Sequence, residues 1–343
     1  MIDNIRFNFE FKPDENWLNK LKEKIYLKKD WQNKSGKAYR GRLFLKEVDL
    51  KETVSTKLKR KKKIPYLLIE ITFTGSGARV QVENSLRKWF YDGVMNREFN
   101  KQTFNECLIL LSEKLFIPVQ ILMDSKVTKV EYGGNMNFSP AFRCFTTCIN
   151  EHKNYEKKCI YGNETVEFKG DYKSIIFYDK ITEETQNSEK FSAKNQKAIN
   201  KRAICIRYEV KIKKVSGVPN AKKHMSYLKD IITNWNLIVD LWVEELDKIV
   251  FINDMNPKVY DYLNDAKIKP INQYLIYLGM EKIGLNNWQL ILKDRTYVKT
   301  RKGLMDSHRA IYNFFKSMLD NELEGFAFVF KSRVKQKAEE FKL

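Results

Sequence analysis

The hydrophobic pattern of this chain changes its period near residue 218, and this change limits the folds open to it. Before that point, short segments at 5–11, 67–74 and 203–213 alternate apolar and polar residues. Such alternation is typical of strands with one buried face. After a Gly/Pro break, apolar residues recur at the helical spacing of 3.6 as far as residue 319. The chain is therefore expected to begin with strands and to end with helices.

Helical segments also lie among the strands of the first part, for example at 101–115, where Phe104, Leu108 and Leu111 share one stripe. This mixed order predicts an α+β domain over residues 1–218. We expect a mostly antiparallel sheet with one polar face and with helices packed on the other face. Residues 219–343 are predicted to form an all-helical domain that binds nucleic acid or supports the first domain.

The charge balance indicates a polyanionic partner. Lys and Arg number 63 against 43 Asp and Glu, which gives a net charge of +20, and phosphate contacts by such residues release counterions. A membrane surface is the competing partner, but no amphipathic basic helix, signal peptide or span of about 18 apolar residues stands out. We expect a nucleic-acid partner, no membrane partner and a cytoplasmic location.

The candidate phosphate contacts come from a basic run at 57–63 and from the strand at 203–213. The run is either a contact with a phosphate backbone or a solvated hairpin tip. The residues expected to bind DNA are Lys57, Lys59, Arg60, Lys61, Lys62, Lys63, Arg207, Lys211 and Lys213.

The cysteines are predicted to be free thiols without a metal. Cys144, Cys148, His152 and Cys159 have the spacing C-x3-C-x3-H-x6-C, which matches no common zinc finger. The first three are four residues apart and would line one stripe of a helix predicted at 140–154. The segment that follows, 159–168, is predicted to form a strand.

Carboxylates recur on the polar side of three predicted strands. Glu70, Glu131 and Glu209 each stand among apolar neighbours and by alternation face away from them. Carboxylates that converge on one sheet face suit Mg²⁺ or Mn²⁺. Tyr178 and Lys180 share a face of the strand at 174–180, and a Tyr can form a covalent phosphotyrosine. The alternative is that all five are ordinary solvent-facing residues.

Several common catalytic signatures are absent from the sequence. With only His152, His224 and His308, the chain has no His-hydrophobe-His pair. No P-loop, Rossmann or serine-hydrolase signature occurs either, so ATP-driven chemistry is not expected.

Five short blocks, taken in order, resemble the replication initiators of filamentous phages and related plasmids, the gene II/X family. The third block, Phe177-Tyr178-Asp179-Lys180, is similar to the block that carries the nicking tyrosine of that family. The other blocks are residues 69–72 with the turn at Glu83-Asn84, residues 127–131, 206–213 and 236–242.

The resemblance implies a rolling-circle initiator that makes a metal-dependent single-strand nick at a replication origin and later rejoins strands. Tyr178 would attack the phosphate and keep the 5′ end, Lys180 would support the phosphate, and Glu131 and Glu209 would hold Mg²⁺ or Mn²⁺. Here Glu131 replaces the Asp of the family, and the turn at 83–84 lacks His. The third ligand is therefore left open among Glu70, Glu83 and Asn84.

The implied partners are single-stranded or supercoiled origin DNA and the helicase and polymerase of a bacterial host, with an oligomer as a further expectation. A different class of function stays open, namely a non-catalytic origin-binding or regulatory DNA-binding protein. An RNA-binding protein has only the charge in its favour.

Overall fold

The fold is described from a computed structural model of the whole chain. It describes residues 1–343 except 30–37, 47–63, 76, 95–96, 140–141, 143–144, 163, 187–203, 252–267, 296–297 and 321–325.

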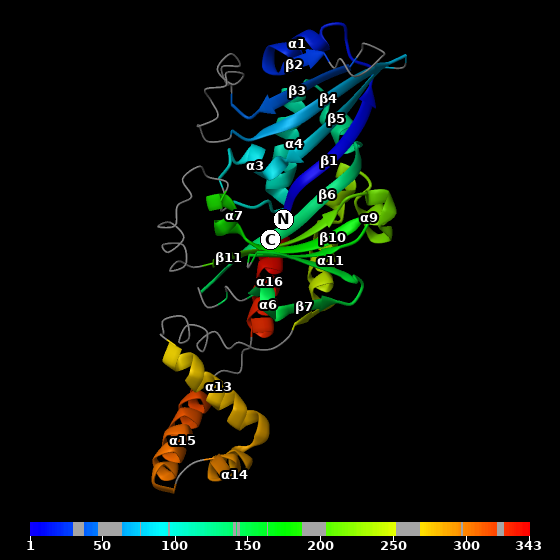
Figure 1. Cartoon of the computed structure of the whole chain (residues 1–343). Coiled ribbons are helices and arrows are strands. Elements are labelled where there is room, and N and C mark those ends of the chain that lie inside the picture. The colour runs from blue at the N-terminus through cyan, green and yellow to red at the C-terminus, as the bar shows by residue number, and fades with distance from the viewer. Residues whose placement is uncertain are drawn as a thin grey trace.

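A ten-stranded antiparallel sheet organises the described part of the chain (Figure 1). Its strands lie in the order β2-β3-β4-β5-β1-β6-β11-β10-β9-β8. In chain order their bounds are β1 Ile2–Phe11, β2 Tyr26–Lys29, β3 Ala38–Phe44, β4 Tyr66–Thr74, β5 Gly77–Ser85, β6 Lys126–Phe138, β8 Lys157–Tyr161, β9 Thr165–Lys169, β10 Lys173–Asp179 and β11 Ile204–Ile212. A small second sheet pairs β7 Ile149–His152 with β12 Ile249–Phe251.

Helices connect and cover these strands. They are α1 Trp17–Lys24, α3 Leu86–Phe90, α4 Lys101–Leu115, α5 Val119–Met123, α6 Phe145–Cys148, α7 Lys180–Gln186, the 3-10 turn η3 Val215–Gly217, α9 Pro219–His224, α10 Leu228–Thr233, α11 Trp235–Asp247, α13 Ile268–Ile283, α14 Leu285–Arg295, α15 Val298–Asp320 and α16 Phe326–Lys342. The predicted α+β class, with helices in the C-terminal region, is confirmed.

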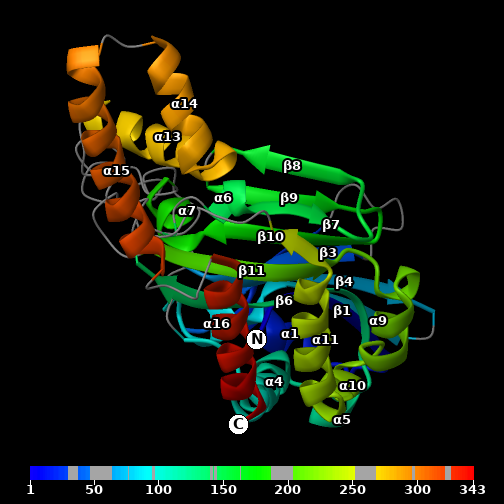
Figure 2. The same cartoon turned by 90° about the horizontal axis from the view of Figure 1, so that it is seen from below.

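One face of the sheet carries the hydrophobic core. The ring of Tyr208 on β11 stacks on Trp242 of α11 with centroids 5.2 Å apart, and Phe138 of β6 stacks on Phe330 of α16. Figure 2 shows α11 and α16 side by side against this part of the sheet. The other face carries rows of charged side chains, as the alternation in the sequence predicts.

The core does not end where the period of the sequence changes. A single buried cluster combines strands before residue 218 with apolar residues of α10, α11 and α16. Helices α13–α15 form a separate group, in which Tyr277 and Phe315 are buried against each other (Figure 1). The sequence predicts one division at 218, whereas the main buried cluster continues across that point and a second small cluster joins α13 and α15.

Two local predictions were wrong. The segment 140–154, predicted as one helix, contains the short α6 and then β7, so that Cys148 and His152 do not share a helical stripe. The segment 159–168, predicted as one strand, is a hairpin of β8 and β9. In both cases short apolar runs were assigned to one element although tertiary pairing divides them.

Among the described residues, no helix has both the length and the apolar character that crossing a bilayer requires.

Candidate functional site

Strand register brings three polar side chains together at the centre of the sheet. Tyr178 on β10 lies opposite Arg207 on β11, and Arg207 lies opposite Asn135 on β6. Glu209, two residues beyond Arg207, has the same facing and lies opposite Gly133. The polar side chains of three neighbouring strands therefore meet on the face opposite to the one that packs on α11 and α16.

A β-bulge in β1 adds a carboxylate to this group. Ile2 pairs with Tyr132 and Ile5 with Val130, so that two residues of β1, Asp3 and Asn4, oppose a single residue of β6. The extra residue lets Asp3 turn to the polar face although Ile2 and Ile5 are both buried. Asp3 is thereby placed within reach of buried arginines.

Arg207 is the centre of this group and has no exposed surface. Its Nη2 donates to Asp3 Oδ2 over 2.9 Å, and its Nη1 donates to Asn135 Oδ1 over 2.8 Å and to Glu98 Oε1 over 3.1 Å. Its Nε donates to Glu209 Oε1. We call Asp3, Glu98 and Glu209, together with Asn135, the Arg207 cage.

The other oxygens of the cage are also held. Asp3 accepts a hydrogen bond from Ser85 and pairs with Arg87, which is almost completely buried. Lys337 of α16 reaches Glu98 Oε2 over 3.2 Å, and Lys211 lies 3.6 Å from Glu209 Oε2. The three buried carboxylates therefore meet several fixed cations, as buried ionised groups require.

Tyr178 is half-buried and joins the cage through its hydroxyl, which donates to Glu209 Oε1 over 3.3 Å. The same oxygen also accepts from Arg207. Lys180, the first residue of α7, places its ammonium 5.4 Å from the centre of the Tyr178 ring and pairs with Glu183. Lys180 therefore does not continue the strand predicted at 174–180, although its ammonium lies over the ring of Tyr178.

The environment moves the pKa values of Tyr178 and Glu209 apart. Burial, followed by the charge of Glu209, raises the pKa of the Tyr178 phenol well above its usual range. Burial also acts to raise the pKa of Glu209, but the charges of Arg207 and Lys211 outweigh it and lower that pKa. Tyr178 is protonated and Glu209 is ionised near neutral pH.

The structure separates the predicted metal ligands. Glu131 on β6 lies opposite Lys211, two residues from the partner of Glu209, so these two carboxylates are diagonal neighbours. Glu70 is on β4, four strands from β11, and pairs with Arg40 over 3.0 Å. At about 4.8 Å per strand it lies too far away to share an ion. The expected convergence of three carboxylates is wrong for Glu70.

The two alternative third ligands also have other contacts. Glu83 on β5 pairs with Arg6 over 2.6 Å. Asn84 has a positive φ of 114° and donates through its side-chain amide to the carbonyl of Tyr66. β5 is separated from β6 by β1, so neither residue adjoins Glu209.

The carboxylates as they lie do not fit a divalent ion. Glu131 pairs with Lys129 over 3.1 Å, and both oxygens of Glu209 face cations. Mg²⁺ and Mn²⁺ require carboxylate oxygens that are free to approach to about 2.1 Å. Within the described residues, no group of three or more His, Cys, Asp or Glu side chains is arranged to hold a metal.

The predicted DNA contacts have three different outcomes. Lys57 and Lys59 to Lys63 lie outside the described residues. Arg207 is wrong as a DNA contact, because it is fully buried in its cage. Lys211 is largely buried beside Glu209, and Lys213 is exposed, with its ammonium on the carbonyl of Gly170.

The sequence analysis missed the cage residues Asp3, Glu98 and Asn135, and also Arg87, which pairs with Asp3. One signal could have revealed Asp3, because the apolar positions of β1 change parity between Ile2 and Ile5. Such a change marks a bulge. Glu98 comes from outside regular structure, and no sequence pattern points to it.

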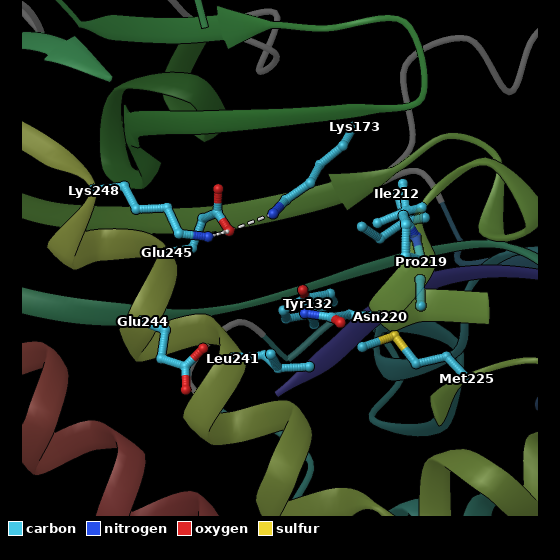
Figure 3. A pocket seen from close by; sticks show the side chains of 12 residues that line it. Tyr132, Lys173, Ile212, Pro219, Asn220, Met225, Leu241, Glu244, Glu245 and Lys248 are labelled. Atoms are coloured by element: carbon cyan, nitrogen blue, oxygen red, sulfur yellow. Dashed lines mark hydrogen bonds and ion pairs between the residues drawn. The ribbon is translucent and has the colours of Figure 1, made fainter. Parts of the chain in front are cut away.

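A second polar group lies on the helix side of the sheet, around the buried Glu245 of α11. His152 lies 3.1 Å from its carboxylate, Lys248 lies 3.0 Å from it, and Lys173 also pairs with it. Figure 3 shows Lys173 and Lys248 reaching Glu245 at one side of a cavity of about 260 Å³ that Tyr132 also lines. This group is separate from Tyr178, because it lies on the opposite face.

A scan against models of protein families finds no match for this chain, and searches of curated proteins and of solved structures find none either.

Proposed function

We propose that this protein cuts one DNA strand by attack of Tyr178 on a phosphodiester. The phenolic oxygen forms a bond to phosphorus while the bond between phosphorus and the 3′ oxygen breaks. The 5′ phosphate stays on Tyr178, and the 3′ oxygen leaves as a hydroxyl. The phenolic proton passes to Glu209 and then to the leaving oxygen, so that charge and atoms balance.

The observation that carries this proposal is the hydrogen bond from the Tyr178 hydroxyl to Glu209 Oε1 on the sheet face opposite to the one that packs on α11 and α16. Glu209 is held by Arg207, so the acceptor is fixed next to the nucleophile. A pair of nucleophile and base in hydrogen-bond contact, with the base oriented by a third group, is the general arrangement of covalent catalysis.

The wider role proposed is initiation of rolling-circle replication. Its support is the resemblance of the five ordered blocks to the gene II/X initiators and the net charge of +20. Under this proposal the substrate is origin DNA, and host helicase and polymerase extend the free 3′ end. A requirement for Mg²⁺ or Mn²⁺ stays a prediction from that resemblance.

A second function is favoured by a specific observation. The raised pKa of Tyr178 and the pairing of Lys180 with Glu183 leave the phenol without the activation that a nucleophile needs. This state fits a non-catalytic protein that binds origin DNA through its basic surface.

The deciding experiment is incubation of the full chain with single-stranded origin DNA, with and without Mg²⁺ or Mn²⁺. We expect a covalent protein–DNA adduct on denaturing gels that is absent in Tyr178→Phe. Tyr227→Phe is the matched control, because Tyr227 is an exposed tyrosine away from the cage. An adduct that survives in Tyr178→Phe contradicts the assignment. Binding without an adduct in every candidate origin favours the second function.

A further inference from the structure

Arg207 contacts Glu209, one of the residues predicted to hold a metal. Its guanidinium contacts carboxylates from three separate segments, namely Asp3 of β1, Glu98 of the segment before α4 and Glu209 of β11. The amide oxygen of Asn135 completes the set. A divalent ion would be surrounded by oxygen ligands in a similar way.

We propose that Arg207 is a built-in cation and a positioning residue: its guanidinium gathers three carboxylates that would otherwise repel one another, and it fixes Glu209 against the Tyr178 hydroxyl. The first part is independent of DNA cleavage. The second part, the consequence for Tyr178, rests on the proposed function.

The shape of the guanidinium explains why an arginine suits this position. Its donors point along fixed directions in one plane, so one side chain holds several acceptors at once. Here Nε, Nη1 and Nη2 each serve a different carboxylate. A lysine at the same place has one flexible ammonium and cannot hold Asp3, Glu98 and Glu209 in the same geometry.

Charges around the cage decide how it responds to pH. The groups that face it are Arg87 and Lys88 of α3, Lys211 of β11, Lys337 of α16, Tyr178 of β10 and the α-amino group of Met1. Burial lowers the pKa of that amino group to about 4, so it carries no charge near neutral pH. Without Arg207, the remaining cations each reach only one of the carboxylates by a direct contact.

The test compares Arg207→Met with the unaltered chain by thermal unfolding from pH 8 to pH 5. In the unaltered chain the arginines hold the pKa of Asp3 and of Glu209 below the value in an unfolded chain. These carboxylates are therefore ionised in both states from pH 8 to pH 5, and they give the unaltered chain no pH slope in that range. In Arg207→Met the three carboxylates repel, and they regain stability by taking up protons. We expect the melting temperature of this variant to be lower by roughly 5–10 °C at pH 8 and to rise as the pH falls.

Two further variants complete the comparison. Arg40→Met is the matched control, since Arg40 pairs with Glu70 on the same sheet but is exposed, and its pH profile should stay that of the unaltered chain. Arg207→Lys keeps the charge but loses the planar set of donors, so it should remove the rise in stability at low pH without restoring the full melting temperature. An Arg207→Met profile parallel to that of the unaltered chain overturns the proposal.

Binding of Mn²⁺, followed by electron paramagnetic resonance, tests the same proposal without DNA. We expect the unaltered chain to retain no Mn²⁺ in the submillimolar range, Arg207→Met to retain one ion per chain, and Asp3→Asn to abolish that binding. If the unaltered chain holds Mn²⁺ and Glu209→Gln or Glu131→Gln releases it, the proposal is overturned.

If Arg207→Met does not fold, a triple variant tests the same proposal. Adding Asp3→Asn and Glu98→Gln removes two of the carboxylates that need the cation, so the triple variant should fold. A triple variant that stays unfolded overturns the proposal. The melting temperatures and the Mn²⁺ binding are measured without DNA. If they turn out as expected and no Tyr178 adduct forms, the proposed function is rejected, but the role of Arg207 as a built-in cation is supported.

Discussion

At the scale of single residues, burial decides what each polar side chain can do. Arg207 on β11 and Lys213, the residue after its end, carry the same charge, yet Arg207 is buried in its cage and Lys213 is exposed. Asp179, next to Tyr178, receives hydrogen bonds from the Ile181 amide and the Thr182 hydroxyl at the start of α7. Its role is that of a helix cap.

Glu245 gives a residue-scale prediction for acid stability. Burial acts to raise its pKa, but the hydrogen bond from His152 and the charges of Lys173 and Lys248 lower it to about 2. Because the pKa is lower in the folded chain, this stabilisation is complete above about pH 4.5 and disappears as the pH falls toward 2. It is worth on the order of 3 kcal/mol.

Glu245→Gln should therefore lower the free energy of unfolding in urea at pH 7 and flatten its decline between pH 5 and pH 3. The control is Glu244→Gln, the adjacent carboxylate at the same cavity, which makes no ion pair within the described residues. Equal effects of the two changes would contradict this account.

At the scale of elements, the approach of β6 to β11 depends on a glycine. A Cβ at Gly133 would meet the carbonyl oxygen of Tyr208 and would lie 2.8 Å from the Cα of Glu209. Both are backbone atoms and cannot rotate away. The glycine therefore allows β6 and β11 to pair at the position from which the Glu209 side chain reaches the Tyr178 hydroxyl.

Gly133→Ala should destabilise the protein by roughly 1–3 kcal/mol, since extra volume against fixed backbone forces the strands apart. The measurement is urea unfolding. Gly75→Ala serves as control, because no atom lies within 4 Å of its added Cβ, and its effect should stay within about 0.5 kcal/mol. A neutral result for Gly133→Ala would mean that the two strands are not in close contact there.

At the scale of the whole molecule, the chain leaves the main core after β12 and returns at α16. Phe251 at the end of β12 and Phe326 at the start of α16 have ring centroids 6.0 Å apart. The two ends of the region between them are therefore close together, and helices α13–α15 pack on one another there. Such an arrangement is typical of a domain inserted at a surface connection.

Replacing residues 252–325 by a short Gly/Ser linker should leave the main core folded, with a melting temperature within about 3 °C of that of the full chain. Differential scanning calorimetry measures this. Ending the chain after residue 325 is the contrasting change. It removes Phe330 and Phe341 from the core and should abolish cooperative unfolding. Loss of folding in the linker variant would show that α13–α15 support the core.

The sequence by itself determined the fold class and, in the strands with clear alternation, which side chains face the core. Period-2 alternation is a local property, so it predicted that Phe177 and Tyr208 are buried, and both are. It also placed Tyr178 and Glu209 on polar faces. The bounds of α4 agreed with the predicted helix at 101–115, because a long amphipathic stripe needs no distant partner to be recognised.

Only the tertiary structure decided which polar residues meet. Strand order separates Glu70 from Glu209, and a bulge in β1 brings Asp3 to a residue more than 200 positions away in the chain. Alternation gives the face of a residue but not its neighbouring strand. For that reason the sequence placed a metal among three glutamates and assigned Arg207 to DNA, whereas long-range pairing buries Arg207 among Asp3, Glu98 and Glu209.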